Sequence, residues 1–257
     1  MNTLSNANQD LAGKLALVTG GGVGIGASIA ESLAARGARV AVTYRSHRPD
    51  DEALARLISI DGQEPVAIAA DLTVEDEVAD LGSQIEGIGA VDILVNNAGG
   101  LIQRSTIAEM SYELFRRVQA LNVDSTFLVT KRMLPLMGPG GRIITVASLA
   151  GRSGGHAGAT AYATSKAALF GFTRGLASEV AERGITVNAV APGFIEATPF
   201  HDTFTSPESK SSTVAGIPVG RAGVPADVAH AVAWLASPAS SFVTGAIVDV
   251  NGGQFFS

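Results

Sequence analysis

The 257-residue sequence contains no cysteine. A disulfide framework, a thiolate nucleophile and a cysteine-ligated metal site are therefore excluded. Only four histidines are present and none stands at a metal-ligand spacing, so we expect no metal centre. Aromatic residues make up 5% of the chain, which means that aliphatic side chains must fill the core.

A surplus of basic residues is also missing, because acidic residues outnumber them and give a formal net charge of −6 and a pI near 5.2. Nucleic acids and anionic membranes bind concentrated basic surfaces, so neither is an expected partner. No apolar run reaches the ~20 residues of a membrane span. The polar residues 1–10 do not resemble a signal peptide. We expect a cytoplasmic protein that acts on a small molecule.

Short apolar runs recur along the chain between longer segments with helical spacing. Runs such as LALV and VAVTY are continuously apolar, which is typical of strands buried on both faces of a parallel sheet. Their alternation with helices predicts an α/β fold, a doubly wound parallel seven-stranded Rossmann-type sheet with helices on both faces. The expected strands are 15–19, 39–44, 66–69, 93–95, 142–146, 186–190 and 247–250.

The chain is expected to form one domain over residues 11–257, preceded by a flexible N-terminal segment over 1–10. Within that domain, residues 199–216 resemble a long irregular insertion, and a lid is expected at about 194–216. Gly37 and Pro225 are typical helix-stop and helix-start residues. The expected helices include 25–36, about 114–136, 162–180 and 225–235.

A glycine-rich turn, TGGGVGIG, follows the first expected strand and leads directly into an apolar helix. Glycines at such a turn let backbone N–H groups approach a pyrophosphate, and the helix N-terminus favours its negative charge. The same turn chemistry also serves packing alone. Its place between a strand and a helix favours dinucleotide binding.

Tyr162 and Lys166 are four residues apart in an expected helix, so the phenol and the ammonium share a face. A tyrosine titrates near ~10 and is a poor acid or base at neutral pH unless a neighbouring cation favours its phenolate. We expect Lys166 to lower the pKa of Tyr162 in this way. Ser148 follows the apolar strand RIITVA, whose end opens onto the ligand crevice of such a sheet. Singly, these residues also suit a turn or a solvated helix face.

The glycine turn, Asp71 after the third expected strand and the NNAG segment ending at Gly99 resemble the short-chain dehydrogenase/reductase superfamily in its core-length form. The resemblance runs from Leu11 to Gly253. It continues, in order, through Asn122, Ser148, Tyr162 with Lys166, Pro192-Gly193 and Asn251-Gly252-Gly253. It implies an oxidoreductase that transfers a hydride between a nicotinamide and a ketone or secondary alcohol carbon.

The resemblance also implies site residues. The catalytic set is Asn122, Ser148, Tyr162 and Lys166, with Tyr162 as acid and base and Asn122 positioning water for a proton relay. The implied cofactor contacts are Gly20, Gly24, Ile25, Gly26, Tyr44, Arg45, Ser46, Asp71, Leu72, Asn97, Ala98, Gly99, Tyr162, Lys166, Pro192, Gly193, Ile195 and Thr198. Asp71 also suits a helix cap, Asn97 a turn and Asn122 a local backbone contact.

The end of the second expected strand decides between NADP and NAD, because an acidic residue there would bind the adenosine ribose and repel a 2′-phosphate. Tyr44 stands there instead, followed by Arg45, Ser46 and His47. An arginine fork suits phosphate, so NADP(H) is preferred. Val23 stands where many NADPH-dependent relatives carry Arg or Lys, and NAD(H) therefore stays open.

Several features bear on the substrate. The PGFIEAT segment and the end of the chain resemble 3-oxoacyl-[acyl-carrier-protein] reductases, but Leu128 and Ser178 stand where those enzymes carry basic residues. A small ketone, polyol or sugar is therefore as suitable as an acyl thioester.

Phe194, Phe200 and Phe204 suit either the apolar underside of a lid or core anchors. His156, in a glycine loop, is expected to contact solvent or substrate.

Two further alternatives concern assembly and class. The helices at about 114–136 and 162–180 are apolar on more than one face and resemble the superfamily's dimer interface, which implies a homotetramer. Internal packing alone would explain the same pattern.

An NAD-dependent alcohol or sugar dehydrogenase remains open as the function, as does a non-catalytic dinucleotide-binding regulator, although the latter would have no use for Tyr162 and Lys166.

Overall fold

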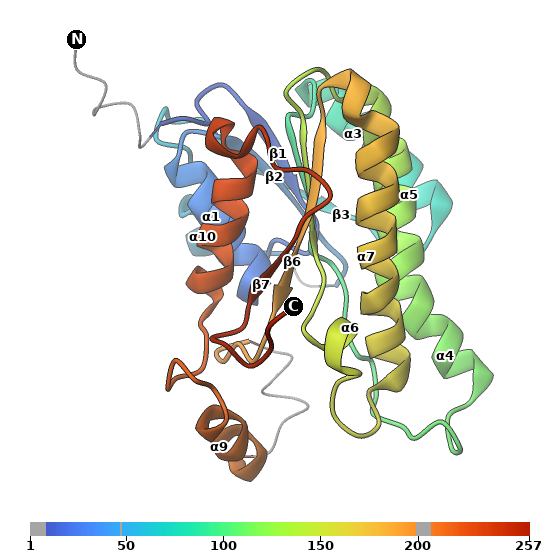
Figure 1. Cartoon of the computed structure of the whole chain (residues 1–257). Coiled ribbons are helices and arrows are strands. Elements are labelled where there is room, and N and C mark those ends of the chain that lie inside the picture. Colours follow the sequence, from blue (N-terminus) through green and yellow to red (C-terminus); the bar gives the residue numbers. More distant parts are fainter. Residues whose placement is uncertain (1–8, 47, 199–206) are drawn as a thin grey trace.

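A parallel seven-stranded sheet forms the centre of this computed structural model, which describes residues 9–46, 48–198 and 207–257 (Figure 1). The strand order is β3-β2-β1-β4-β5-β6-β7, and every neighbouring pair is parallel. The strands are β1 (Leu15–Val18), β2 (Arg39–Tyr44), β3 (Val66–Ala69), β4 (Ile93–Asn96), β5 (Arg142–Val146), β6 (Thr186–Pro192) and β7 (Ile247–Val250).

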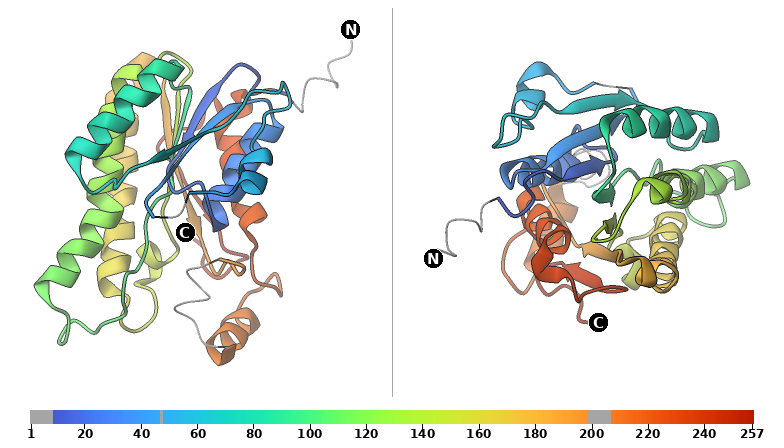
Figure 2. Two further views of the ribbon diagram at one scale, coloured as in Figure 1. Left: turned by 180° about the vertical axis from the view of Figure 1, so that it is seen from behind. Right: turned by 90° about the horizontal axis from the view of Figure 1, so that it is seen from above.

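Helices cover both faces of the sheet, as the views from behind and from above also show (Figures 1 and 2). Helices α1 and α10 lie on one face, whereas α3, α5 and α7 lie on the other. The helices are α1 (Gly24–Ala35), α2 (Asp51–Ala55), α3 (Glu75–Ile88), α4 (Tyr112–Gln119), α5 (Ser125–Met133), α6 (Ala150–Ser153), α7 (Thr160–Val180), α9 (Pro207–Ala215) and α10 (Pro225–Ala236).

The alternation of side chains along β1 shows why this sheet must be covered twice. Ala16 and Val18 pack in the apolar cluster formed with α1 and α10, whereas Leu15 and Leu17 pack in the cluster formed with α3, α5 and α7. All four side chains are buried. A strand that is apolar on both faces is stable only between two helical layers. The predicted fold class is therefore confirmed.

The predicted element boundaries agree with the structure to within about two residues for all seven strands. The single helix expected at about 114–136 is interrupted, because a π-helical turn, Ala120–Asp124, separates α4 from α5. The prediction of an irregular segment over 199–216 is wrong for its second half, which forms α9. Asp10, placed in the flexible N-terminal segment, forms an ion pair with Arg36.

The strand order reverses direction between β1 and β4, and ligands of doubly wound sheets bind where the carboxyl ends of the strands meet such a reversal. The short helix α6 and helix α9 both lie at that end of the sheet (Figure 1). None of the helices in the described part of the chain combines the length and apolar character needed to span a bilayer. The described residues also contain no cluster of three or more His, Asp or Glu side chains suited to a metal ion.

Candidate active site

A cleft of about 600 Å³ lies at the carboxyl ends of β1, β4, β5 and β6. It brings together most of the residues predicted from the sequence. Those that line it are Gly20, Gly24, Ile25, Gly26, Asn97, Ala98, Gly99, Ser148, Tyr162, Lys166, Pro192, Gly193, Ile195 and Thr198. The glycine turn and the Ser/Tyr/Lys set therefore share one cavity.

Tyr162 and Lys166 lie on the first turns of α7 and face the cleft together. The Nζ atom of Lys166 lies 5.7 Å from the centroid of the Tyr162 ring. The same Nζ donates a hydrogen bond of 2.9 Å to the carbonyl oxygen of Val146, the last residue of β5. Lys166 is 4% exposed, so its ammonium is held in place by the sheet below it.

Ser148 lies in the turn between β5 and α6, next to the phenol. Its Oγ accepts a hydrogen bond of 3.1 Å from the backbone N–H of Ala150, which fixes the position of the hydroxyl oxygen. A hydrogen bond also joins Ser148 to the side chain of Tyr162. The two hydroxyl groups therefore lie close enough to contact one substrate oxygen together.

Burial governs the titration of both ionisable groups in this set. It raises the pKa of Tyr162 above its usual value, and the hydrogen bond from Ser148 opposes that rise. Burial also lowers the pKa of Lys166 from 10.5 to about 8. The pKa of Tyr162 is thus raised rather than lowered as expected from Lys166, because loss of water around the phenol outweighs the hydrogen bond with Ser148. Tyr162 is consequently protonated at neutral pH and suited to donate its proton.

The glycine turn has the close backbone packing that a phosphate cradle requires. Gly20 has a φ of +62° and Gly24 one of +55°, both in the left-handed region that favours glycine. A Cβ on Gly26 would collide with the carbonyl oxygen of Gly20 and would lie 2.5 Å from Nδ2 of Asn97. No side chain therefore fits at Gly26, and the backbone of the first turn of α1 approaches the end of β4 closely.

Asn97 holds the glycine turn against the end of β4. Its Nδ2 donates to the carbonyl oxygens of Thr19 and Gly20, at 2.9 and 3.1 Å. Thr19, which the sequence argument did not select, accepts the N–H groups of Asn97 and Ala98 on its Oγ1 at 2.9 and 3.0 Å. The sequence does carry a signal for Thr19, because it is a hydroxyl residue directly between a buried strand and a glycine turn. Asn97 is thus a turn residue that also lines the cleft.

Asn122 is fully buried in the π-helical turn and does not line the cleft. Its Oδ1 accepts the N–H of Gly100 at 3.0 Å, and its Nδ2 donates to the carbonyl oxygens of Gly100 and Val118. These contacts match the alternative role given above for Asn122, a local contact with the backbone. Its expected place in a proton relay stays a prediction.

Comparisons with known proteins agree with this geometry. Residues 21–254 match the family model described as Enoyl-(Acyl carrier protein) reductase. The 3-oxoacyl-[acyl-carrier-protein] reductase FabG of Vibrio cholerae is 41% identical over 250 residues, which cover 96% of this chain and 99% of that protein. The chain belongs to the short-chain dehydrogenase/reductase superfamily.

Solved structures of the superfamily show the same fold. A blue fluorescent protein from a metagenomic library, in complex with NADPH, has a TM-score of 0.86 and 39% identity, covering 96% of this chain and 100% of that one. A putative NAD(P)-dependent gluconate 5-dehydrogenase from Beutenbergia cavernae, with bound NADP, has a TM-score of 0.88 and 36% identity. The match covers 96% of this chain and 99% of that one.

The residues that the superfamily resemblance assigned to the adenosine half of the cofactor lie outside the cleft. They are Tyr44, Arg45, Ser46, Asp71 and Leu72. Asp71 accepts the N–H and the hydroxyl of Thr73 at 3.0 and 2.6 Å, and α3 begins only at Glu75. Asp71 therefore closes the turn before α3 rather than capping the helix.

Arg45 is exposed at the end of β2, and His47 lies outside the described residues. The pKa of Asp71 lies below its usual value, chiefly through the Thr73 hydrogen bond, and the Arg45 charge adds to that lowering. The Arg45 guanidinium and the Asp71 carboxylate, which is the expected adenine contact, are thus near enough to interact. Buried Pro49 lies beside the glycine turn, 3.0 Å from where a Cβ of Gly22 would stand.

The cleft also contains polar residues that the superfamily motifs do not include. They are Arg104, Ser153, Thr213 and Gln254. His156 lines the cleft too, as its expected contact with solvent or substrate requires. Phe194 is buried and packs with Ile217 and Ala222, which supports the core-anchor alternative for this residue. Phe200 and Phe204 lie outside the described residues.

Proposed function

We propose that this chain, an NAD(P)-dependent oxidoreductase by its superfamily membership, transfers a hydride between NADP(H) and the carbon of a ketone or secondary alcohol. Tyr162 acts as the general acid and base. One observation carries the proposal. The Ser148 hydroxyl, the Tyr162 phenol and the Lys166 ammonium line the same cleft as the glycine turn, whose residues Gly20, Gly24 and Gly26 bring the bare backbone to the cavity.

The chemistry of the three side chains follows from their contacts. Tyr162, protonated at neutral pH because burial raises its pKa, gives its proton to the oxygen of the substrate as that oxygen gains charge. Ser148, oriented by the N–H of Ala150, donates a hydrogen bond to the same oxygen. Lys166 has a pKa of about 8, so at neutral pH it is mostly charged and stabilises the phenolate that remains. The bound nicotinamide supplies or accepts the hydride.

The preference for NADP(H) rests on Arg45. It is exposed at the end of β2, and Tyr44 and Ser46 beside it carry no negative charge that would repel a 2′-phosphate. The solved relatives described above with NADPH and NADP support the same preference. NAD(H) remains an alternative because Val23 supplies no second cation.

The test is to follow NADPH and NADH absorbance with purified protein against ketones, diketones and an acetoacetyl thioester. Turnover with NADPH faster than with NADH supports the proposal. Binding of NADPH without turnover of any carbonyl compound, while the protein is folded, would contradict it and favour a regulator. Turnover with NADH alone would overturn the cofactor assignment only.

Reduction of 3-oxoacyl groups on an acyl carrier protein is the second candidate, favoured by the 41% identity to the Vibrio cholerae enzyme. An acidic carrier would need basic residues on the facing helices. Leu128 and Ser178 offer none there, and the nearby Lys131 and Arg132 of α5 form ion pairs with Glu75 and Glu86. Equal kcat/KM for the acetoacetyl group on pantetheine and on the carrier protein would exclude carrier docking.

The assembly proposed is a homotetramer built on α5 and α7. Ala167, Ala168 and Gly171 of α7 are exposed, and Phe127 of α5 is 49% exposed, so small and apolar groups of these helices face solvent in the single chain. Burying that surface against a second copy would be favourable. Light scattering after size-exclusion chromatography measures the assembly, and a monomer would contradict it. The cytoplasmic location stays a prediction.

A further inference from the structure

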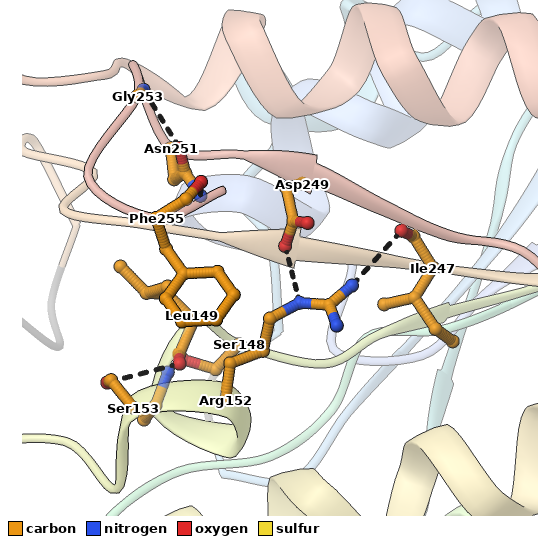
Figure 3. Close-up of polar contacts among 10 residues, drawn as sticks. Ser148, Leu149, Arg152, Ser153, Ile247, Asp249, Asn251, Gly253 and Phe255 are labelled. Carbon is orange, nitrogen blue, oxygen red and sulfur yellow. Dashed lines mark hydrogen bonds and ion pairs between the residues drawn. The ribbon is translucent and has the colours of Figure 1, made fainter. Parts of the chain in front are cut away.

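The end of the chain forms part of the wall of the cleft. After β7 the chain turns back, and Gln254 lines the same cavity as Ser148 and Tyr162. We call residues 251–257 the C-terminal segment. Asn251 fixes its turn, because the Asn251 Oδ1 accepts the N–H of Gly253 at 2.9 Å and its Nδ2 donates to the carbonyl oxygen of Phe255 at 3.1 Å (Figure 3).

Arg152 connects this segment to the loop that carries Ser148. Its guanidinium lies 5.9 Å from the centroid of the Phe255 ring and donates from Nε to the carboxylate of Asp249 at 2.8 Å (Figure 3). Arg152 belongs to α6, whose first residue follows Ser148 by two positions. Gln254, between residues held by these contacts, therefore occupies a defined place in the wall.

The orientation of the Gln254 carboxamide follows from one hydrogen bond. Its Oε1 accepts the backbone N–H of Phe194 at 3.1 Å. Only the oxygen of an amide can accept, so this contact fixes which end of the side chain is which. The approach is close enough that a Cβ on Gly193 would lie 2.6 Å from the same Oε1. Among the residues that the structure describes, the Nε2 of Gln254 has no hydrogen-bond partner.

We propose that Gln254 is a specificity-determining residue, which donates a hydrogen bond from Nε2 to an acceptor oxygen on the substrate. This inference rests on the proposed function and narrows its substrate class. Because Oε1 is turned toward the N–H of Phe194, Nε2 is the other end of the carboxamide, and it carries two N–H donors. The favoured substrates therefore carry a second oxygen acceptor near the carbonyl that is reduced, as a 1,3-dicarbonyl compound does.

The rest of the cleft strengthens this selectivity. Leu149, Ala150 and Phe194 also line it, so part of its wall is apolar. A plain ketone of the same length would displace water from Nε2 without replacing the hydrogen bond. A site that loses a hydrogen bond in this way discriminates against the substrate that lacks the acceptor.

The test compares two substrates of equal chain length, ethyl acetoacetate and methyl pentyl ketone, in the full-length protein with NADPH. Gln254→Glu is the informative variant, because its carboxylate still accepts the N–H of Phe194 but has no N–H to donate. Gln254→Met is a second variant that removes both functions. Circular dichroism and the NADPH dissociation constant of each variant establish that the fold and the cofactor site are intact.

In the wild type we expect a higher kcat/KM for ethyl acetoacetate than for methyl pentyl ketone. Gln254→Glu and Gln254→Met should each lower that ratio roughly 10-fold, with unchanged NADPH affinity. A ratio that stays at the wild-type value overturns the inference. So does an equal loss for both ketones together with weaker NADPH binding, because Gln254 would then act on the cofactor. If the wild type reduces neither ketone while binding NADPH, the proposed function fails, and the inference with it.

Discussion

Arg152 of α6 and Asp249 of β7 form an ion pair in which 2.8 Å separate Nε and Oδ1 and both side chains are largely buried, at 14% and 16% exposure. The guanidinium also lies 5.1 Å from the centroid of the Phe170 ring of α7. One side chain thus joins the loop of Ser148, the helix of Tyr162 and the last strand. The pair thus holds two segments that line the cleft against β7, the strand that precedes Gln254.

Removing one partner of this pair should destabilise the protein strongly. Asp249→Leu leaves the Arg152 charge in a largely buried place without its counterion, which costs about 3 kcal/mol. The double variant Arg152→Met with Asp249→Leu removes both charges and should lose clearly less. Urea unfolding of both variants and the wild type measures the difference. A double variant less stable than Asp249→Leu would show that the charge pairing is not the dominant contribution.

Gly99 should tolerate no side chain, because a Cβ there would lie 2.5 Å from the Oδ1 of Asn122 and 3.1 Å from the Nζ of Lys166. Gly99→Ala is expected to cost about 1–3 kcal/mol of stability and to displace Lys166 from the cleft. Gly87→Ala is the matched control, since its surroundings leave open space. Thermal unfolding and turnover of the two variants give the comparison. Full activity in Gly99→Ala would show that Lys166 can move without consequence.

Lys166 should make the protein more stable as the pH rises from about 8 toward 10. Its pKa is lowered from 10.5 to about 8 in the folded chain, so across that interval the unfolded chain binds more protons than the folded one. Stability rises with pH wherever that holds. The Lys166→Met variant lacks this contribution. Chemical unfolding at a series of pH values should show a smaller gain with pH in the variant, and parallel curves would mean that the folded ammonium titrates normally.

Ser148→Ala should move the pH profile of alcohol oxidation to higher pH. In the proposed chemistry, oxidation uses the phenolate of Tyr162, and the hydrogen bond from Ser148 lowers a pKa that burial raises. Without that bond a higher pH is required to form the phenolate. The measurement is kcat/KM for oxidation against pH, with Thr164→Ala, an exposed α7 residue outside the cleft, as the control. A shift to lower pH, or none, would contradict the assigned contact.

Arg45→Ala tests the cofactor preference. If Arg45 binds the 2′-phosphate, its loss should raise the KM for NADPH by roughly 10-fold and leave the KM for NADH unchanged. Arg39→Ala is the control, because Arg39 begins β2 whereas Arg45 follows the end of that strand. An unchanged KM for NADPH in Arg45→Ala would overturn the assignment.

The fold was predictable from the sequence because strands such as β1 are continuously apolar and alternate with helical segments, a pattern typical of a parallel sheet covered on both faces. Helix α9 was missed because Pro207, Ser209 and the Ser-Ser-Thr run before Ala215 resemble turn residues, and helix propensity is weak in such a sequence. The π-helical turn at Asn122 has no periodicity signal of its own.

The site was predictable where its residues are near each other in sequence or stand in a known motif. The titration of Tyr162 was not, because its direction depends on burial by residues far along the chain. Gln254 was missed for a similar reason. Its hydrogen-bond partner, Phe194, lies 60 positions earlier, and nothing in the residues beside Gln254 indicates the contact.

Proton exchange between Tyr162 and the substrate is the step on which the proposed chemistry depends, and the Tyr162→Phe variant removes it. The variant keeps the ring but loses the hydroxyl that Ser148 contacts. We expect it to bind NADPH with wild-type affinity and to lose turnover by at least about 10²-fold, a typical contribution of a general acid. Stopped-flow absorbance on preformed NADPH complexes of the two proteins gives both values. Ketone reduction at the wild-type rate by a variant that binds NADPH normally would contradict the account.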